Sequence, residues 1–497
     1  MPLRRLLLTI SHYSLGSLLT TLAGLVSFPF LTRIFSVSDY GTMNLVSATL
    51  AALVAVGKMG LQHAIVRFHA RTQTNVGAPD RQFLVSTAVL GMAAGGLSIA
   101  LAWVAVVAFL PLDWLGDGRL RMLLTLIAAL TVVQVVDSAL VNLLRAEERS
   151  AVLTAYQVLK KYLGLGLMIS SLMLIRRDLS LFYSAQIFAE VVALLFLGLV
   201  VFRSGSGLPK PSPGSFSAAL LVEMLRYGVP MMLGWELSGL ILSLGDRYLV
   251  QGLLGPGALG TYAAAYNLCQ YVEAIWVSPW GLAITPIYLR LWDRNDKEQA
   301  QAFIERSLRY YILLGVPAIA GLAAIGPELL SLLASDKYRD GAPAIPYVVA
   351  GLIAAGAVPI TGAGVFIQRR SWVAARYVVL SAILNLGLNV VLIPAKGIQG
   401  AALATFASYF ALLACMTRAG ASHLSVAIPW GLGARAVATA AVMYLVLAPM
   451  QVGGLIGTLG AKIGLGLLVY GGLILAVEAR AREALATLLA RARGSEL

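Results

Sequence analysis

Residues 83–110 read FLVSTAVLGMAAGGLSIALAWVAVVAFL, a run without a single charged side chain. At a rise of about 1.5 Å per residue, a helix of this length spans the roughly 30 Å hydrocarbon core of a bilayer. The whole chain has the same character: 59% of its 497 residues are apolar and 12% are charged. A soluble domain usually carries about twice that charged fraction. The sequence therefore predicts an all-α polytopic membrane protein.

Similar apolar runs recur along the chain and predict about fourteen transmembrane helices. Lys and Arg are concentrated in alternate loops, and this excess marks the cytoplasmic side of the membrane. An even number of spans then places both termini in the cytoplasm. The predicted spans are 9–32, 42–63, 83–110, 121–144, 151–174, 179–202, 224–250, 258–288, 307–327, 342–367, 373–393, 398–418, 427–448 and 453–477.

A linker rich in Gly, Ser and Pro (203–222) divides the spans into two groups. We expect an N-lobe of six spans (1–202), a C-lobe of six spans (223–420), and two further spans with a cytoplasmic tail (421–497). Residues 293–308 combine charges with apolar residues at helical spacing, which predicts an amphipathic helix on the cytoplasmic surface of the C-lobe.

The two lobes carry an internal repeat. RSAVLTAYQVLKKYLGLGL (149–167) aligns without gaps to RSWVAARYVVLSAILNLGL (370–388), and ten of the nineteen positions are identical. Gly41 and Gly260 occur in similar strings at almost the same offset. A repeat of six spans keeps both halves in one orientation, related by an axis along the membrane normal. Such pseudo-symmetric lobes are expected to enclose a central cavity and to work by alternating access.

Three strings resemble one known group of transporters: FPFLTRIFSVSDYGTMNL (28–45), LRYGVPMMLGWELSGLILSLGDRYLV (225–250) and LNLGLNVVLIPAKGIQGAALAT (384–405). Together they are similar to the multidrug/oligosaccharidyl-lipid/polysaccharide (MOP) exporter superfamily, in its polysaccharide branch with the O-antigen (Wzx-type) flippases.

The resemblance implies translocation of undecaprenyl-pyrophosphate-linked oligosaccharide, an O-antigen or exopolysaccharide repeat unit, from the cytoplasmic to the periplasmic leaflet of a bacterial inner membrane. It implies contact with membrane lipids, and a polysaccharide polymerase and chain-length regulator as partners. It implies no cofactor.

Ionisable side chains within the spans are candidates for a transport site, because a charge at mid-bilayer costs on the order of 2.5–3.5 kcal/mol on insertion scales. Lys58, Arg33 and Arg247 have the positive charge that a pyrophosphate requires, and we expect them to line a cationic cavity. Ion pairing that fixes helix packing is the alternative, either between Asp246 and Arg247 or between Lys58 and a carboxylate such as Asp137.

Four carboxylates in the spans cannot attract an anion, so they are candidates for coupling transport to protons or sodium ions. They are Glu236, Glu273, Asp137 and Glu190. His12 and His63 titrate near neutral pH, but both lie near predicted cytoplasmic span ends, where we expect them to be solvated.

The sequence also argues against several functions. It has no GxxxxGK[ST] loop for ATP, and no Asp-x-Asp pair, His cluster or GxSxG motif, so we predict no enzymatic activity. The net charge of +14 is scattered through short loops, which disfavours nucleic-acid binding. The remaining alternatives are a lipid II flippase, a cation-coupled drug antiporter of the same superfamily, and a membrane-embedded glycan polymerase or ligase.

Overall fold

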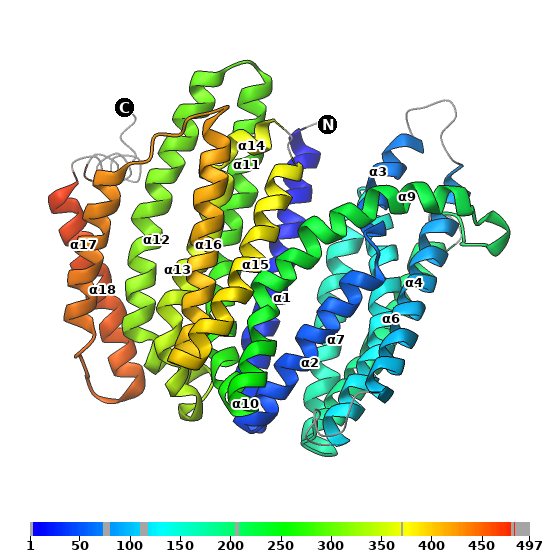
Figure 1. The fold of residues 1–497 in the computed structure, drawn as a ribbon, viewed down its shortest axis with the longest axis horizontal. Helices are drawn as coiled ribbons and strands as arrows, with labels where there is room; N and C mark the ends of the chain where they lie inside the picture. The colour runs from blue at the N-terminus through cyan, green and yellow to red at the C-terminus, as the bar shows by residue number, and fades with distance from the viewer. Residues whose placement is uncertain are drawn as a thin grey trace. The chain divides into compact units, whose positions relative to one another are not determined.

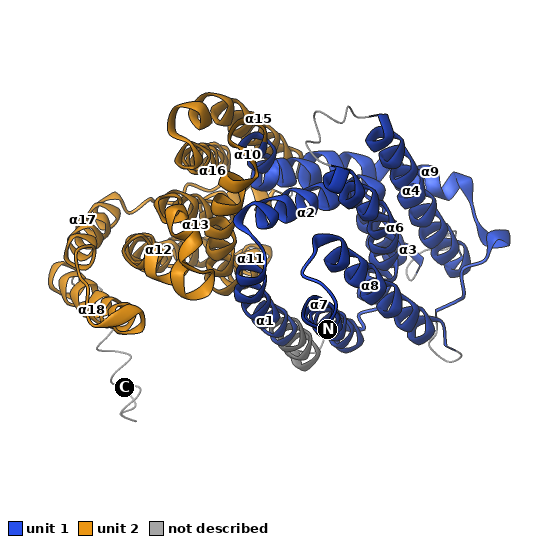
Figure 2. Ribbon diagram, turned by 90° about the horizontal axis from the view of Figure 1, so that it is seen from below, with its two compact units in different colours: residues 1–251 blue, residues 252–497 orange. Residues whose placement is uncertain are grey.

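The computed structural model describes residues 3–72, 80–109, 118–203, 208–368 and 371–478 together with Arg482, and side chains from residue 15 onward except that of Ser371. Throughout these ranges the regular structure is helical, without strands (Figure 1). The chain divides into two compact units, residues 1–251 and 252–497 (Figure 2). The prediction of an all-α polytopic fold is confirmed.

The first unit is built from the helices α1 to η2 and the first part of α10. Polar side chains cap several of their starts: Ser36 accepts from the Asp39 amide at α2, Asp178 from the Ser180 amide at α8, and Ser217 from the Leu220 amide at α9. The helices are α1 (Leu3–Ile34), α2 (Val37–Gly57), α3 (Leu61–Thr72), α4 (Arg81–Phe109), α6 (Gly118–Ala146), α7 (Ser150–Leu174), α8 (Leu179–Phe202), the short η1 (Pro213–Ser215), α9 (Ala218–Met231) and the π-helical turn η2 (Met232–Leu237).

The chain passes from the first unit to the second within α10 (Ser238–Val272). Gly255 breaks this helix, with φ of 84° and ψ of 175°. The second unit continues with a second π-helical turn, η3 (Glu273–Val277), followed by α11 (Ser278–Asp293), α12 (Lys297–Leu333), the 3₁₀ helix η4 (Asp336–Ala344), α13 (Ile345–Thr361), α14 (Ala363–Ile367), α15 (Ser371–Lys396), α16 (Ile398–Ala421), α17 (Trp430–Leu447) and α18 (Gly454–Val477).

The two units pack their helices in the same order. In the first unit α4 packs on α6, α6 on α8, and α8 on α7 (Figure 2). In the second unit α12 packs on α13, α13 on α16, and α16 on α15. The helices α7 and α15, which contain the aligned strings of the internal repeat, therefore take the same place in this order. The last two helices, α17 and α18, pack on each other and on α12.

Twelve helical segments of the described chain are long and apolar enough to cross a membrane. One of them, Ala218–Asp293, has 76 residues, about 110 Å of helix, and its break at Gly255 divides it into two crossings. α7 is not among the twelve because Lys160 and Lys161 lower its hydropathy, although its 25 residues are long enough to span a bilayer. The predicted count of about fourteen is consistent with these segments.

Three predicted segments differ in detail from the structure. The span predicted at 42–63 is interrupted between α2 and α3. The amphipathic segment 293–308 is not a separate helix, because residues from Lys297 onward continue without a break into α12. The loop that the predicted spans 307–327 and 342–367 leave at 328–341 consists mainly of the end of α12 and the 3₁₀ helix η4.

The lobe boundaries remain a prediction. The boundary between the compact units lies at residues 251–252, whereas the predicted linker ends at 222, because α9 packs on α3 and α4. Linker residues 204–207, the His12 side chain and almost all of the tail after Glu478 lie outside the described parts of the chain.

Candidate functional site

Lys58 lies at the end of α2, in the short turn before α3. Met59 and Gly60 in this turn have φ of 50° and 73°, a left-handed conformation that no α-helix can continue through. Gly60 also lies against α9: a Cβ on Gly60 would be 1.9 Å from the carbonyl oxygen of Gly228. Glycine is therefore required at position 60, and the contact holds the Lys58 turn close to α9 and the following turn η2.

Glu236 lies in η2 and faces three side chains from this turn and α3. Lys58 Nζ is 3.3 Å from Glu236 Oε1, Gln62 Nε2 donates to Glu236 Oε2, and His63 Nε2 is 4.0 Å from Glu236 Oε2. We call these four residues the Glu236 cluster. The side chains of Lys58 and Glu236 are 21% and 22% exposed, so the pair retains accessible surface. π-Helical turns are rare and often mark functional sites.

One interpretation of the sequence pairs Lys58 with Asp137. The structure shows otherwise, because Asp137 contacts Lys160. It belongs to a second group, which we call the Lys160 cluster: Asp137 on α6, Tyr156 and Lys160 on α7, and Glu190 on α8. Lys160 Nζ is 3.0 Å from Asp137 Oδ2 and 3.5 Å from Glu190 Oε2. The Tyr156 hydroxyl donates to Asp137 Oδ1. One lysine thus bridges two carboxylates and joins three helices of the first unit.

Two neutral amides complete the surroundings of Glu190. Gln134 Nε2 donates to Glu190 Oε1 at 2.8 Å, and Gln186 Nε2 donates to the same oxygen at 3.3 Å. Hydrogen bonds of this kind stabilise the ionised carboxylate within a membrane-spanning segment. Lys161, next to Lys160, also interacts electrostatically with Glu190.

The other two predicted cations are not brought into either cluster. Arg33 is exposed at the end of α1, where its Nη1 donates to the Pro29 carbonyl at 3.1 Å. Arg247 is 2% exposed. Its Nη1 donates to the Ser243 carbonyl at 2.8 Å and lies 3.4 Å from Asp246 Oδ1. The predicted Asp246–Arg247 pair is therefore present.

Glu273, the remaining predicted carboxylate, belongs to the second unit. It begins the π-helical turn η3 and is partly buried. Two of the four carboxylates predicted for ion coupling, Glu236 and Glu273, therefore each lie in a π-helical turn.

Several residues of these groups were not predicted as site residues. The sequence does mark Lys160 as unusual, because it belongs to a Lys-Lys pair in the middle of an apolar span. Gln62 and Tyr156 have none, because uncharged polar residues are common in spans. A further pair, Lys462 on α18 and Glu328 on α12, lies 2.8 Å apart in the second unit. Lys462 also donates to the Ala324 carbonyl at 2.9 Å.

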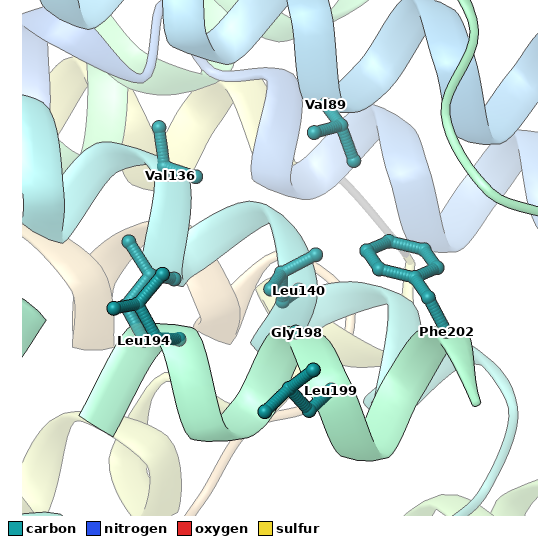
Figure 3. Close-up of a pocket in the computed structure, with 8 residues that line it drawn as sticks. Val89, Val136, Leu140, Leu194, Gly198, Leu199 and Phe202 are labelled. Carbon is teal, nitrogen blue, oxygen red and sulfur yellow. The ribbon is translucent and has the colours of Figure 1, made fainter. Parts of the chain in front are cut away.

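The first unit also has a pocket of about 490 Å³ between α4, α6 and α8. Figure 3 shows the side chains of Leu140, Leu199 and Phe202 around it. Its lining is apolar, and none of the predicted site residues contributes to it. It is therefore unsuited to an anionic group, and the polar clusters are the better candidates for a substrate site.

Two family models each match more than half of the chain. The model described as "Polysaccharide biosynthesis protein" matches residues 6–292, and that described as "Lipid II flippase MurJ" matches residues 168–459. Among curated proteins, the probable low-salt glycan biosynthesis flippase Agl15 of Haloferax volcanii is 24% identical over 384 residues, which cover 76% of each chain. The uncharacterized membrane protein MJ1068 of Methanocaldococcus jannaschii is 24% identical over 225 residues, 44% of this chain and 43% of the relative.

Solved structures show the same fold. A lipid II flippase MurJ in an inward closed conformation gives a TM-score of 0.73 at 13% identity, covering 95% of this chain and 99% of that structure. An inward-facing multidrug resistance MATE transporter of the MOP superfamily gives 0.68 at 14% identity, covering 83% and 97%. Together, the family models and the candidate spans show that the chain is a multi-pass membrane protein of the polysaccharide biosynthesis protein family, with the fold that MurJ and the MATE transporter share.

Proposed function

We propose that the chain flips a lipid-linked oligosaccharide between membrane leaflets and is not an enzyme. The support is its family, whose model covers residues 6–292, and its relative Agl15, which is named as a probable glycan biosynthesis flippase. In finer detail, the proposed substrate is an undecaprenyl-pyrophosphate-linked O-antigen or exopolysaccharide unit. The proposed direction is from the cytoplasmic to the periplasmic leaflet of a bacterial inner membrane, with both termini cytoplasmic. A polymerase and a chain-length regulator are the proposed partners.

The Glu236 cluster is the observation that carries this proposal. An ammonium group within a membrane-spanning segment is costly, and among the described residues Lys58 is paired there with one carboxylate, Glu236. A pyrophosphate has the charge and the acceptor oxygens to replace Glu236 as the partner of Lys58. Glu236 is then free to take up a proton or a sodium ion, so anion binding and cation binding are coupled at one pair.

The other predicted residues have secondary places in this proposal. Arg33 is exposed and is proposed as a further contact of the anion. Arg247 has that role only if its buried pair with Asp246 opens. Glu190 and Asp137 share Lys160, so a proton on either carboxylate would change the pairing of the other. They are proposed as coupling residues on this ground.

A lipid II flippase is the second candidate function. It is favoured by the MurJ family model over residues 168–459 and by the likeness to the fold of MurJ. Both candidate substrates carry a sugar on a prenyl pyrophosphate, so the Glu236 cluster suits either of them.

The test is transport by the purified chain in proteoliposomes. Two fluorescent probes are compared, lipid II and an undecaprenyl-pyrophosphate-linked oligosaccharide without peptide. Lys58→Ala should reduce translocation at least tenfold, and Lys58→Arg should retain part of it, because the charge remains while the head-group geometry differs. Lys396→Ala is the matched control, since this lysine is exposed at the end of α15.

The structural alternative makes the opposite prediction. If Lys58 serves only to neutralise Glu236, Lys58→Ala should first lower thermal stability. Glu236→Gln added to Lys58→Ala should then restore stability and transport together, because it removes the stranded charge. That rescue would exclude substrate binding by Lys58.

A further inference from the structure

Three aromatic side chains gather in the second unit next to the π-helical turn η3. The rings of Trp276 and Tyr311 are stacked, with centroids 5.1 Å apart and planes at 28°. Trp280 meets Tyr311 edge-on at 5.6 Å and lies 6.1 Å from Trp276. Tyr311 is buried, whereas both tryptophans retain exposed surface. Tyr311 therefore backs one face of Trp276 and supports two partly exposed indole rings.

The surrounding helices leave room for these rings. A Cβ on Gly315 of α12 would be 3.0 Å from the Trp276 ring, and a Cβ on Gly356 of α13 would be 2.2 Å from the Tyr311 hydroxyl oxygen. That hydroxyl donates to the Ile353 carbonyl at 2.8 Å, which fixes the ring of Tyr311. The aromatic group is thus held rigidly by α12 and α13 and is not a chance contact of mobile side chains.

Glu273 begins the π-helical turn that contains Trp276, three residues before Trp276 and seven before Trp280. Its carboxylate interacts electrostatically with Tyr311, but within the described part of the chain it forms no hydrogen bond or ion pair. A carboxylate in a span requires a partner. The acceptor oxygens of Glu273 therefore remain available to a ligand beside the indole rings.

The depth of the group distinguishes it from an interfacial aromatic belt. The segment from Pro256 to Asp293 forms one membrane crossing, and Trp276 is near its middle. It lies roughly 25–30 Å along the helix from either end. Tryptophans that anchor a protein at the membrane surface lie at the level of the lipid head groups. The position of Trp276 and Trp280 needs another explanation.

We propose that Trp276, Trp280 and Glu273, supported by Tyr311, form a sugar-binding site for the glycan head of the substrate. A pyranose ring presents axial C–H groups to an aromatic face and hydroxyl groups at its edge. The indole rings can contact the C–H face, and the Glu273 carboxylate can accept hydrogen bonds from the hydroxyl groups. Small-molecule sites usually combine apolar walls with a few polar groups in this way. This inference rests on the proposed function, because an aromatic pair with a carboxylate also suits an organic cation. Membership of the polysaccharide family favours the sugar.

The test measures binding to the purified full chain in detergent by calorimetry. Two probes differ only in the sugar: farnesyl pyrophosphate linked to a disaccharide of N-acetylglucosamine, and farnesyl pyrophosphate alone. The wild type should bind the sugar-bearing probe more tightly. Trp276→Leu and Trp280→Leu should each weaken that binding about 2- to 12-fold, the range for one aromatic contact, and leave the sugar-free probe unaffected. Glu273→Gln should weaken it at least as much.

Trp430→Leu is the matched control, because Trp430 is 77% exposed on α17, outside the aromatic group, and its loss should change neither affinity. Equal affinity of the wild type for the two probes, or variants that weaken both probes equally, would overturn the sugar site. A third outcome would also overturn the sugar site: the wild type binds the organic cation tetraphenylphosphonium, and the tryptophan variants lose this binding but still bind the sugar-bearing probe. Failure of the wild type to bind either probe would instead overturn the proposed function.

Discussion

The first unit joins three of its helices through partly buried charges, whereas in the described part of the second unit no ion pair joins the corresponding helices. In the first unit, Lys160 on α7 connects Asp137 on α6 with Glu190 on α8. In the second, α13 and α16 meet where Gly351 lies against Tyr409 and where Thr417 donates to Thr361 at 2.6 Å. At the repeat offset of 221 residues, the position of Lys160 is occupied by Ser381.

This difference between the units shows whether the fold requires ion pairs between its helices. In the described residues, α12, α13, α16 and α15 pack in the same order without an ion pair between them, so this packing order does not depend on ion pairs; the pair Lys462–Glu328 joins α18 to α12. Charges within spans are costly even when they are paired. The ion pairs of Lys160 with Asp137 and Glu190 are therefore better explained by function than by stability, which supports the proposal that these carboxylates take part in ion coupling.

The largest expected effect is loss of the bridging lysine. Lys160→Met should lower the free energy of unfolding by about 3–5 kcal/mol, because it leaves two carboxylates without their counter-charge. Unfolding in mixed micelles of increasing SDS content measures this. Adding Asp137→Asn and Glu190→Gln should recover most of the loss. If the single variant is as stable as the wild type, charge pairing does not hold the first unit together and the comparison fails.

Close glycine contacts occur in both units and provide a second test. Gly60→Ala should cost about 2–3 kcal/mol, because position 60 has φ of 73° and its Cβ would meet Gly228. Gly364→Ala in the second unit should be similarly destabilised, since its Cβ would be 2.2 Å from the Gly420 carbonyl oxygen. Only Gly60→Ala should also reduce transport, because it displaces the Lys58 turn.

Gly387 on α15 is the matched control for both glycine variants, since a Cβ there meets nothing within 4 Å. Gly387→Ala should be neutral or slightly stabilising. Equal loss of transport in Gly60→Ala and Gly364→Ala would show that the Lys58 turn has no special role.

The repeat itself supplies the third comparison. Tyr156 and Tyr377 are aligned, but only Tyr156 donates to a carboxylate. Tyr156→Phe should therefore cost about 1.5 kcal/mol, the lower value for a hydrogen bond to a charged group. Tyr377→Phe should change stability by less than about 0.5 kcal/mol. Thermal denaturation of the two variants side by side measures the difference. Equal losses of stability would show that the hydrogen bond from Tyr156 to Asp137 does not stabilise the fold.

The fold was largely predictable because apolar runs of span length need no tertiary information. The α7 span illustrates the limit: Lys160 and Lys161 make it weakly apolar, so the crossing predicted at 151–174 stays a prediction, which the likeness of this segment to α15 supports. What the sequence did not reveal was the interruption of the second span, since the left-handed turn at Met59 and Gly60 depends on contact with α9.

The charged residues were predictable, but their partners were not. Lys58 and Glu236 are 178 residues apart, and their meeting depends on how each helix is rotated about its axis. The break before α3 and the π-helical turn η2 both alter that rotation, and neither has a reliable sequence signal. Both Lys58 and Asp137 lie within predicted spans, so the sequence allowed them to pair. In the structure Asp137 pairs with Lys160 instead.

The smallest expected effect concerns a charge that lies outside the spans. Arg119, at the start of α6, contacts Asp39 at 2.8 Å and Asp178 at 3.0 Å, and so joins the starts of α2, α6 and α8. Partial burial alone would raise the pKa of Asp178, but hydrogen bonds from Ser180 and the charge of Arg119 outweigh it and lower the pKa. The second unit has Gly397 at the corresponding position before α16.

A lowered pKa in the folded state means that ionised Asp178 stabilises the fold at neutral pH. This contribution is complete above the unfolded value of about 3.9 and is lost as the pH falls through the lower folded value. Asp178→Asn should therefore reduce stability by less than about 1 kcal/mol at pH 7, since the pair with Arg119 is partly exposed. The difference from the wild type should shrink below about pH 4, which thermal denaturation between pH 3 and 7 measures. A difference that stays constant with pH would mean that Asp178 acts as a neutral helix cap and that its charge contributes nothing.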